Sequence, residues 1–457
     1  MARYGVRAGD GRGDGPAARR VVIVGGGASG GLVAAALLRD GPAGLEVTVV
    51  EPRPGLALGA AFSTREPWHR LNVPAVAMSA LPGDPDHFRR WLACQPDAFA
   101  SRTEYGRYLQ SFLAEAAASS PATFRHVRAR AVRLLDGAGG LAVAVDGDAA
   151  ALPADAVVLA TGNELPAIPA VLLPWRDDSR LVADPWAPGS LDPIADGEVV
   201  AILGSGHTAL DLAASILRGR PRSIVVAISR RGELPRAHED PWRPRLPQPL
   251  FTVEQFLRFE DPLADAARLI RAHGDDWRPA FDSLRPIHQQ LWRAMDPELR
   301  RRFLADWRRT WEIHRSRVPP EVMRDTAAWI AQGRLEVRAG TIDAVEGAGP
   351  RLRIIVGAPP QVVADRVLLA IGPDERATAN PLLAAAIGDG LLRPDPLGLG
   401  PDVDPATGRV RDAAGAATRP VYAMGPLRRG AVWETIAIPE IRVQASEVAA
   451  AILGAAG

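Results

Sequence analysis

The stretch Val21-Val22-Ile23-Val24-Gly25-Gly26-Gly27-Ala28-Ser29-Gly30 decides the fold of this 457-residue chain. Four β-branched apolar residues in a row predict a buried parallel strand, and the glycines after them allow a sharp turn into an alanine-rich helix. A helix that begins in this way points free backbone amides at its N-terminus, where a pyrophosphate can bind. We therefore expect a Rossmann-type dinucleotide site here, with contacts from Gly25, Gly27, Ser29 and Gly30.

A second stretch of the same kind occurs later in the chain. Val199-Val200-Ala201-Ile202-Leu203 is followed by Gly204-Ser205-Gly206-His207-Thr208-Ala209, and another helical pattern begins there. Two fingerprints in a strand-turn-helix context predict two bound dinucleotides. The expected contacts of the second site come from Gly204, Gly206, His207 and Thr208, although His207 has an alternative role as a residue that only caps the turn.

The residue that ends the next apolar run differs between the two units and suggests which dinucleotide each one binds. Glu51 follows Val47-Thr48-Val49-Val50 in the first unit, and Arg230 and Arg231 follow residues 223–229 in the second. A carboxylate at this place accepts hydrogen bonds from both ribose hydroxyls and repels a 2′-phosphate, whereas guanidinium groups bind that phosphate. The first site is therefore expected to bind FAD or NAD, and the second NADPH.

Composition excludes several classes of protein. All 54 basic residues are arginine, so Schiff-base lysine chemistry and the phosphate-loop lysine of ATPases are excluded. Cys94 is the single cysteine, so the chain can form no disulfide, no dithiol redox pair and no cysteine-rich metal cluster, and we expect no metal site. The net charge of +1 argues against nucleic acid or an anionic membrane as a partner. The apolar stretch 21–38 is long enough to resemble a membrane span, but its strand-then-helix pattern argues against one. We therefore expect a cytoplasmic protein.

Two similar segments, Asp155–Gly162 and Asp365–Gly372, each follow one dinucleotide unit. Each begins with an aspartate, continues as a buried strand and ends in small residues that let the backbone run close to a cofactor, so Thr161 and Gly162 are further candidate contacts. The order of these segments predicts a nicotinamide domain inserted within a flavin domain.

The fold class that these patterns predict is α/β, with two Rossmann-like dinucleotide-binding domains and a helical insertion. The expected division is a disordered leader (1–18), the FAD domain in two parts (19–170 and 373–457), the NADPH domain (171–240 and 331–372) and a helical insertion or cap (241–330).

The helical insertion holds six of the 11 tryptophans of the chain. Its amphipathic pattern, for example over 297–315, indicates that Trp292, Phe303, Trp307 and Trp311 form a core. An alternative, compatible with the first, is a cap over an active site in which Arg278 and Arg285 select an anionic substrate.

Several motifs together resemble those of the two-dinucleotide-domain flavoproteins, and within them a bacterial FAD/NAD(P)-binding family near the N-hydroxylating and Baeyer-Villiger flavin monooxygenases. The resemblance covers residues 20–455. Its motifs are Leu71-Asn72-Val73-Pro74 with Met78-Ser79, Tyr105-Gly106-Arg107-Tyr108-Leu109, Gly425-Pro426-Leu427-Arg428-Arg429-Gly430 with Trp433-Glu434, and Pro439-Glu440-Ile441-Arg442.

The resemblance implies further site residues. Gly425 and Pro426 are expected to contact the flavin, at a place where such proteins usually have Gly-Asp. Asn72 and Trp433 are expected to line the flavin as candidate catalytic residues, and the alternatives are a loop-capping amide and a packed indole. The chain departs from these families in two other places. Asn163 stands where N-hydroxylases carry tyrosine or histidine, and of the Baeyer-Villiger fingerprint only Trp186 has a counterpart.

The function that these features favour is a FAD-dependent, NADPH-consuming monooxygenase. It would act on a small molecule, an anionic one among the candidates, by way of a C4a-peroxyflavin formed with O2, and N-hydroxylation is one such reaction. Two alternatives remain: a FAD-dependent NADPH oxidoreductase without oxygen transfer, and a flavin-bound redox-sensing interaction protein.

Overall fold

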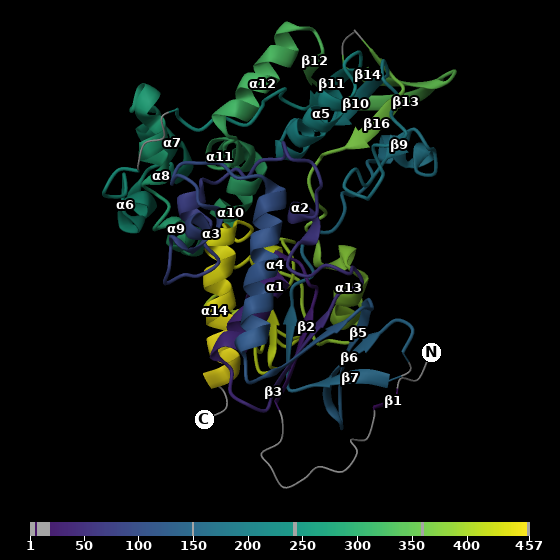
Figure 1. The fold of residues 1–457 in the computed structure, drawn as a ribbon. Helices are drawn as coiled ribbons and strands as arrows, with labels where there is room; N and C mark the ends of the chain where they lie inside the picture. The colour runs from purple at the N-terminus through teal and green to yellow at the C-terminus, as the bar shows by residue number, and fades with distance from the viewer. Residues whose placement is uncertain (1–4, 7–18, 149, 241–244, 358–360, 455–457) are drawn as a thin grey trace.

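The computed structural model describes residues 5–6, 19–148, 150–240, 245–357 and 361–454. Figure 1 shows three parts: a sheet domain that contains α1, α4 and α14, a second sheet domain around β10 and β11, and a group of short helices beside it. The expected leader, 1–18, lies outside the described residues except for Gly5–Val6, which pairs as β1 with β7.

The first domain is built on a five-stranded parallel sheet. Its order is β17 (Val421–Ala423), β8 (Ala156–Leu159), β2 (Arg19–Val24), β3 (Leu45–Val50) and β4 (Thr123–Val127). The apolar residues of its central strands are buried on both faces, as in a parallel sheet covered on both sides. One cover consists of α1 packed against α4 and α14, with bounds Ala28–Asp40, Arg102–Ser119 and Ile438–Gly454.

The second domain repeats this plan. Its parallel sheet has the order β12 (Leu335–Ala339), β11 (Ile224–Ser229), β10 (Val199–Leu203), β16 (Arg366–Leu369) and β9 (Leu181–Val182). The helix α5, His207–Gly219, follows β10 and packs its apolar side into the core cluster of this sheet. Both fingerprints therefore open helices at the carboxyl end of a central strand, where Rossmann domains bind their ligands.

Each parallel sheet has a smaller sheet beside it whose three long strands are antiparallel, and β1 adds a fourth, parallel strand to the first of these. The strands are β5 (Ala131–Gly137), β6 (Gly140–Val145) and β7 (Ala150–Ala154) in one, and β13 (Ile342–Ala348), β14 (Arg351–Val356) and β15 (Val362–Ala364) in the other. Alternation of residues over 126–145 predicts antiparallel strands, the apolar run 362–369 predicts one strand, and the structure differs from both predictions. His126 belongs to the parallel strand β4, where it pairs with Val49, so antiparallel pairing begins only at β5. The apolar run 362–369 forms two strands in different sheets, and the chain passes between them at Asp365.

The aspartates that begin the two repeated segments have the same structural role. Asp155 accepts hydrogen bonds from the backbone N of Arg20 (2.7 Å) and from its guanidinium, and Asp365 accepts one from the backbone N of Val199 (2.8 Å). Each therefore fastens the strand after it to the fingerprint strand of the same sheet. Burial by itself raises the pKa of Asp155, but the bonds from Arg20 outweigh it and hold the pKa below its ordinary value.

The third part is a group of helices within the expected insertion; residues 245–331 are called the helical unit. The bounds of its helices are α6 (Val253–Arg258), α7 (Pro262–Arg271), α8 (Trp277–Asp282), α9 (His288–Ala294), α10 (Pro297–Arg302), α11 (Arg308–Arg315) and α12 (Pro320–Ala331). The predicted helix 297–315 is continuous in helical structure, but its middle, Phe303–Trp307, is a π-helical turn. Trp292, Phe303, Trp307 and Trp311 all belong to one apolar cluster, which confirms the expected core.

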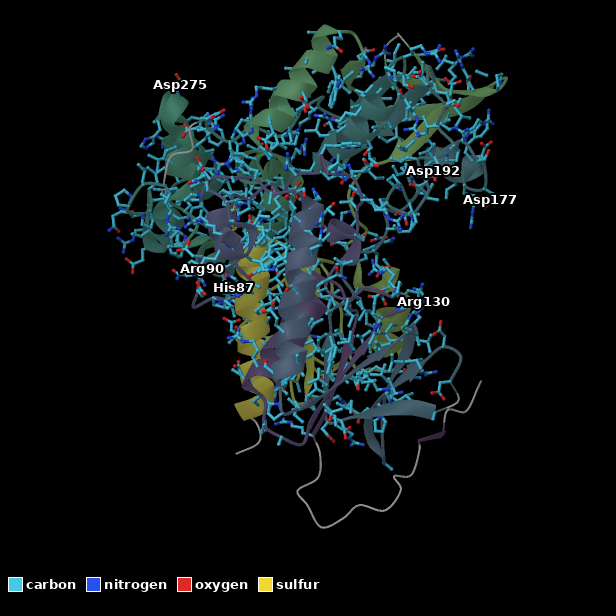
Figure 2. The ribbon with its side chains drawn as sticks, viewed as in Figure 1. His87, Arg90, Arg130, Asp177, Asp192 and Asp275 are labelled. Atoms are coloured by element: carbon cyan, nitrogen blue, oxygen red, sulfur yellow. The ribbon has the colours of Figure 1, made fainter. Side chains whose placement is uncertain are left out.

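Shorter elements complete the fold: α2 (Gly59–Phe62), α3 (His87–Leu92) and α13 (Pro381–Gly388), with 3-10 turns at 75–77, 170–175, 274–276, 377–379 and 425–428. In Figure 2, Asp275 marks the outer tip of the helical unit, and Asp177 and Asp192 lie on the outer edge of the second sheet domain. Within the described part of the chain, no helix has the length and hydropathy needed to cross a bilayer.

Candidate active site

The first fingerprint is a turn that only glycine can form. Gly25 has a φ of +98°, donates its backbone N–H to the Val50 carbonyl at 2.9 Å, and faces the Ala160 carbonyl so closely that a Cβ would collide with it. A Cβ on Gly30 would collide with the Gly25 carbonyl. The turn is thereby pressed against β8 and β3, and α1 starts with its amides free at the edge of the sheet. Gly27 is the residue before α1 and has no side-chain cap that would block those amides.

The carboxylate of Glu51 is fixed beside this turn. It is 3% exposed, and one of its oxygens accepts from the backbone N of Gly26 at 3.0 Å. Arg53 donates to the carboxylate from its backbone N (3.1 Å) and from Nε (2.8 Å). Burial raises the pKa of Glu51, but the Arg53 and Gly26 bonds outweigh it and lower the pKa, so the group is ionised at neutral pH. An ionised, oriented acceptor is what the recognition of a ribose diol requires.

Residues from the far end of the chain join this fingerprint. Gly425 has a φ of +60°, and a Cβ at this position would stand 2.5 Å from the Ser29 Oγ of α1. The turn is held by the Gln444 side chain, which accepts from the Gly425 backbone N (3.0 Å), and by the Thr435 hydroxyl, which donates to the Gly425 carbonyl (2.8 Å). The structure thus brings together Ser29 and Gly425, two of the predicted contacts.

Thr161 and Gly162 lie at the end of β8, next to the first fingerprint. The Thr161 Oγ1 is buried and has no hydrogen-bond partner among the described residues, which is unusual for a buried hydroxyl. Gly162 has a φ of +80° and open space where a Cβ would stand. Gly162 and Pro426 line a small polar cavity of about 30 Å³ together with Asn163. An orphaned hydroxyl and an uncovered glycine at this edge fit a bound dinucleotide such as FAD, and the residues present therefore suit that group.

The second fingerprint has the same geometry with a more open surface. Gly204 has a φ of +124° and donates to the Ile228 carbonyl at 2.7 Å, and a Cβ on it would lie 2.7 Å from the carbonyl carbon of Ala370. A Cβ on Gly206 would have nothing within 4 Å. Thr208 is half-buried in the first turn of α5. The space over Gly206 leaves room for a pyrophosphate at the start of this helix.

His207 has a partner within the protein. Its Nε2 lies 3.3 Å from the Arg317 carbonyl, and burial lowers the pKa of the imidazole, so the ring is neutral. This contact ties the start of α5 to the segment between α11 and α12 of the helical unit, and no side chain caps the start of α5, so the role of His207 at a phosphate stays a prediction.

Arg230 and Arg231 lie exposed just after β11, and neither pairs with a carboxylate among the described residues. The loop that carries them is fixed at the Glu233 carbonyl, which accepts from the Ser205 hydroxyl (2.6 Å) and from the Arg309 guanidinium (2.7 Å). Burial, and to a smaller extent Arg231 and Arg230, lowers the pKa of Arg309, which donates to the loop that carries them. Sequence reasoning missed Arg309, since it comes from the helical unit and no local motif marks it.

Asn72 lies where the two sheet domains meet. Its carbonyl accepts from the His238 Nε2 at 2.9 Å, and its side-chain amide makes no hydrogen bond with the described residues. A second interdomain contact lies close by in the chain, since His69 contacts the Ser215 hydroxyl (2.8 Å) and Arg102 pairs with Asp211 (2.9 Å). The loop around Asn72 therefore joins the first domain to the second domain near α5.

Trp433 lies at the boundary between the helical unit and the first domain. Its ring centre is 5.2 Å from those of Trp292 and Phe303, and it is 8% exposed. The guanidinium groups of Arg308 and Arg429 lie 5.4 and 5.5 Å from its centre. The surroundings of Trp433 are those of a packed indole that carries the segment after Gly425 into the core of the helical unit.

A buried group of charges completes this boundary. Glu434 accepts from the Trp311 indole at 2.6 Å and pairs with Arg315 at 3.4 Å, while Glu440 pairs with Arg285 at 3.1 Å and Arg315 at 3.5 Å. Arg285 is therefore engaged by a carboxylate of the protein, and its role in selecting an anionic substrate stays a prediction. Arg278 donates its Nε to the Ala237 carbonyl at 3.0 Å. Arg285 lies in the turn before α9, Arg315 in α11 and Glu440 in the first turn of α14, so these ion pairs form only when the segments come together in the folded chain.

Known families and structures share this architecture. Residues 22–164 match the family model described as FAD-NAD(P)-binding. No curated protein matches the sequence well enough to count as a relative. Two hydroxylases have similar structures with a TM-score of 0.63: an ornithine N-hydroxylase from Kutzneria sp. 744 (16% identity, covering 97% of this chain and 100% of that one) and an L-lysine 6-monooxygenase from Pseudomonas syringae (17%, covering 96% and 99%).

A reductase has a similar structure too. The bacillithiol disulfide reductase from Staphylococcus aureus is 12% identical, has a TM-score of 0.57, and is matched over 96% of this chain and 100% of that one. At such identities the likeness concerns the fold, which hydroxylases and reductases share. Residues 22–164 thus match an FAD-NAD(P)-binding family model, and the chain as a whole has two Rossmann-type domains in a fold similar to that of an ornithine N-hydroxylase, an L-lysine 6-monooxygenase and a bacillithiol disulfide reductase.

Proposed function

We propose that this protein is an FAD-dependent, NADPH-consuming monooxygenase that acts on a small molecule. The observation that carries the proposal is the contrast between two complete fingerprint units in one chain. One has the buried carboxylate of Glu51 at its strand end, and the other has the exposed guanidinium groups of Arg230 and Arg231. A carboxylate that accepts hydrogen bonds from both ribose hydroxyls suits the adenosine ribose of FAD, and a pair of guanidinium groups suits the 2′-phosphate of NADPH.

The residues of the first site would hold FAD in a fixed orientation. The α1 amides would bind the pyrophosphate and Glu51 the ribose, and the unpartnered Thr161 hydroxyl would gain a hydrogen bond. The helix α14 begins at Ile438, so its positive end would favour negative charge on a flavin ring placed before it. Bound FAD supplies the chemistry that accepts hydride from NADPH and passes electrons to O2. The residues of the chain would bind and orient FAD and exclude water from it.

The single cysteine separates this proposal from the disulfide reductases that share the fold. Cys94 is half-buried at the end of α3, and burial raises the pKa of its thiol, so little thiolate forms at neutral pH. Reduction of a disulfide by a paired dithiol would need a second cysteine, and the sequence has none. Oxygen transfer or electron transfer to a non-thiol acceptor remains as the chemistry that this chain can support.

The experiment is stopped-flow absorbance on the purified flavoprotein. The protein is reduced with NADPH in the absence of oxygen and then mixed with oxygenated buffer. A transient band that differs from both oxidised and reduced flavin supports oxygen transfer, and a screen for a substrate that accelerates its decay follows. Direct reoxidation without a transient, together with turnover of an added electron acceptor, contradicts the monooxygenase and favours the reductase. Failure of NADPH to bleach the flavin contradicts both and favours the interaction protein.

A further inference from the structure

The loop that follows β11 lies between the second fingerprint and the helical unit. The Glu233 carbonyl of this loop accepts a hydrogen bond from the Ser205 hydroxyl of the fingerprint at 2.6 Å, and another from Nη2 of Arg309 on α11 at 2.7 Å. A fingerprint side chain and a guanidinium of the helical unit therefore meet at the same oxygen atom. Arg230 and Arg231 lie in the same loop, just before Glu233. Arg309 thus comes from a distant part of the chain to the place where the adenosine end of a dinucleotide is expected.

The backbone fixes this loop against the helical unit. Arg236 donates its backbone N–H to the Ile313 carbonyl of α11 at 3.1 Å, and its own carbonyl accepts from the backbone N of Val318 at 2.9 Å. The backbone N–H of His238 donates to the Val318 carbonyl at 2.9 Å. These bonds join the loop to α11 and to the segment after it, so the position of Arg309 beside the loop does not depend on one side-chain contact.

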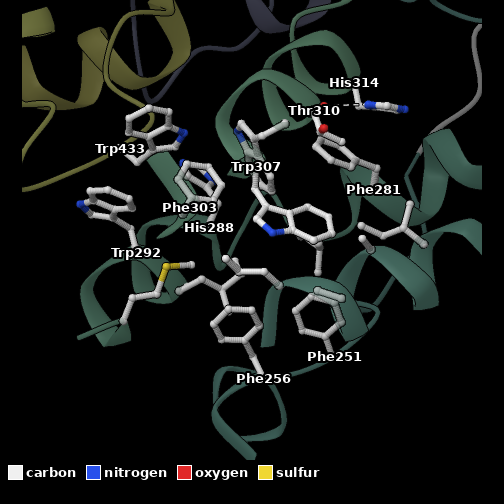
Figure 3. Close-up of a pocket in the computed structure, with 18 of the residues that line it drawn as sticks. Phe251, Phe256, Phe281, His288, Trp292, Phe303, Trp307, Thr310, His314 and Trp433 are labelled. Carbon is white, nitrogen blue, oxygen red and sulfur yellow. Dashed lines mark hydrogen bonds between the residues drawn. The ribbon is translucent and has the colours of Figure 1, made fainter. Parts of the chain in front are cut away.

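The two sides of α11 have different surroundings. Thr310, Trp311 and His314 line an apolar cavity of about 180 Å³ in the helical unit. Figure 3 shows Thr310 and His314 beside Phe281 at this cavity, and the ring centres of Phe281 and Trp311 are 4.8 Å apart. At about 3.6 residues per turn, Arg309 leaves the opposite side of the helix. The packing of the aromatic side therefore fixes the direction in which Arg309 leaves α11.

Arg309 forms no ion pair with a carboxylate in the part of the chain that the structure describes. Glu312, on the same helix, pairs with Arg308 at 2.9 Å. Burial lowers the pKa of Arg309, nearby carboxylates oppose this change, and repulsion from Arg231 and Arg230 adds to it. Arginine has several N–H donors, so the bond to the loop carbonyl leaves others for a ligand. A half-buried cation that two other cations repel is stabilised when an anion binds to it.

We propose that Arg309 is a third cation for the 2′-phosphate of NADPH, which the helical unit supplies in addition to Arg230 and Arg231. This inference rests on the proposed function, since it takes NADPH as the ligand of the second site. A guanidinium stays charged at neutral pH, and a phosphate has several acceptor oxygens, so one phosphate can bind more than one arginine. NADH lacks the 2′-phosphate. Arg309 therefore acts on the choice between the two nucleotides and not on the binding of their common part.

The test is calorimetric titration of the purified protein, saturated with FAD, with adenosine 2′,5′-bisphosphate and with adenosine 5′-monophosphate. These probes differ only in the 2′-phosphate, and neither has a nicotinamide, so the measurement does not depend on a reaction at the flavin. We expect Arg309→Gln to lower the affinity for the bisphosphate about 5- to 30-fold, the value of a charge-assisted hydrogen bond at a partly exposed site. The affinity for the monophosphate should not change.

Two further variants serve as controls. Arg258→Gln removes an equal charge at the exposed end of α6, and it should change neither affinity. Arg309→Lys keeps the charge, so it should lose less affinity for the bisphosphate than Arg309→Gln does. Full flavin content and unchanged circular dichroism show that each variant is folded. Equal losses for both probes in Arg309→Gln would mean that Arg309 only holds the loop, and unchanged affinities would mean that it does not reach the phosphate. Either result would overturn the proposal.

Failure of this proposal is distinguishable from failure of the proposed function. Equal binding of the two probes by the unaltered protein would show that the second site does not recognise a 2′-phosphate, and the preference for NADPH would fail with it. If the unaltered protein prefers the bisphosphate, and Arg230→Glu abolishes this preference while Arg309→Gln retains it, NADPH remains the ligand and only the role of Arg309 is overturned.

Discussion

The contact between Gly425 and Ser29 predicts a strong, rescuable defect. Substitution of Gly425 by alanine places a Cβ at a φ of +60° and 2.5 Å from the Ser29 Oγ, while the Ser29 Cβ stays at 3.5 Å. An L-residue in the left-handed region costs about 1–2 kcal/mol, and overpacking of a closed contact adds about 1–3 kcal/mol. Gly425→Ala should therefore lower the free energy of unfolding by about 2–5 kcal/mol. The measurement is urea unfolding with FAD in excess, followed by flavin and tryptophan fluorescence.

A second substitution, at Ser29, separates the backbone cost of Gly425→Ala from its overpacking cost. Ser29→Ala removes the Oγ and leaves an ordinary contact at 3.5 Å, so the double variant should recover the overpacking part and retain only the backbone cost. The four proteins form a double-mutant cycle, in which any effect of Ser29→Ala on FAD affinity cancels. Gly398→Ala is the reference for the backbone cost, because Gly398 has a φ of +75° with nothing within 4 Å of a Cβ. Additive effects of the two substitutions would show that the Gly425 turn does not contact Ser29 of the first fingerprint, and would refute the reasoning.

Three further predictions concern charge and chemistry. Arg230→Glu should weaken NADPH binding about 10- to 100-fold by calorimetry, the value of one or two charge-assisted bonds, with NADH affinity and FAD content little changed; unaltered NADPH affinity would mean that the 2′-phosphate lies elsewhere. Burial, and then Arg317, lowers the pKa of His238 to about 3, so its stabilising contribution is full above the unfolded pKa of about 6.5 and is lost as the pH falls toward 3. His238→Gln, which keeps a donor for the Asn72 carbonyl, should reduce the loss of stability between pH 7 and pH 5 by about 1–2 kcal/mol after allowance for solvent screening, and an identical pH profile would exclude this histidine as the cause. Cys94→Ser should leave NADPH consumption unchanged in a steady-state assay, whereas its loss would reveal an unexpected thiol step.

The sequence predicted the cofactor-binding frame because that frame is local. A φ above zero at Gly25 and Gly204 follows from residue type, and burial on both faces follows from unbroken runs of β-branched residues. The pattern also indicated the helical core around Trp292 and Phe303 correctly. The prediction failed for the apolar run 362–369, which contributes one strand to each of two sheets on either side of Asp365. Periodicity predicts that a strand is present but not which strand it pairs with.

The site contacts depended on residues distant in the chain. The partnering of Arg285 with Glu440, the approach of Arg309 to the loop of Arg230, and the role of Trp433 in the helical core could not be predicted from neighbours in sequence. The sequence does not distinguish a charged or aromatic side chain that faces a substrate from one that faces a buried partner. The two side chains differ in how far they are desolvated, and this is set only when the helices pack.

The sequence by itself determined two Rossmann units and the charge that distinguishes them, because turns, strands and fingerprint offsets are set by neighbouring residues. Only the tertiary structure decided that Ser29 meets Gly425, that Asn72 joins the two domains, and that Arg285 and Arg315 pair with Glu440. These features arise from the close packing of segments that lie far apart in the chain, where the position of each side chain is fixed by surfaces it meets only after folding.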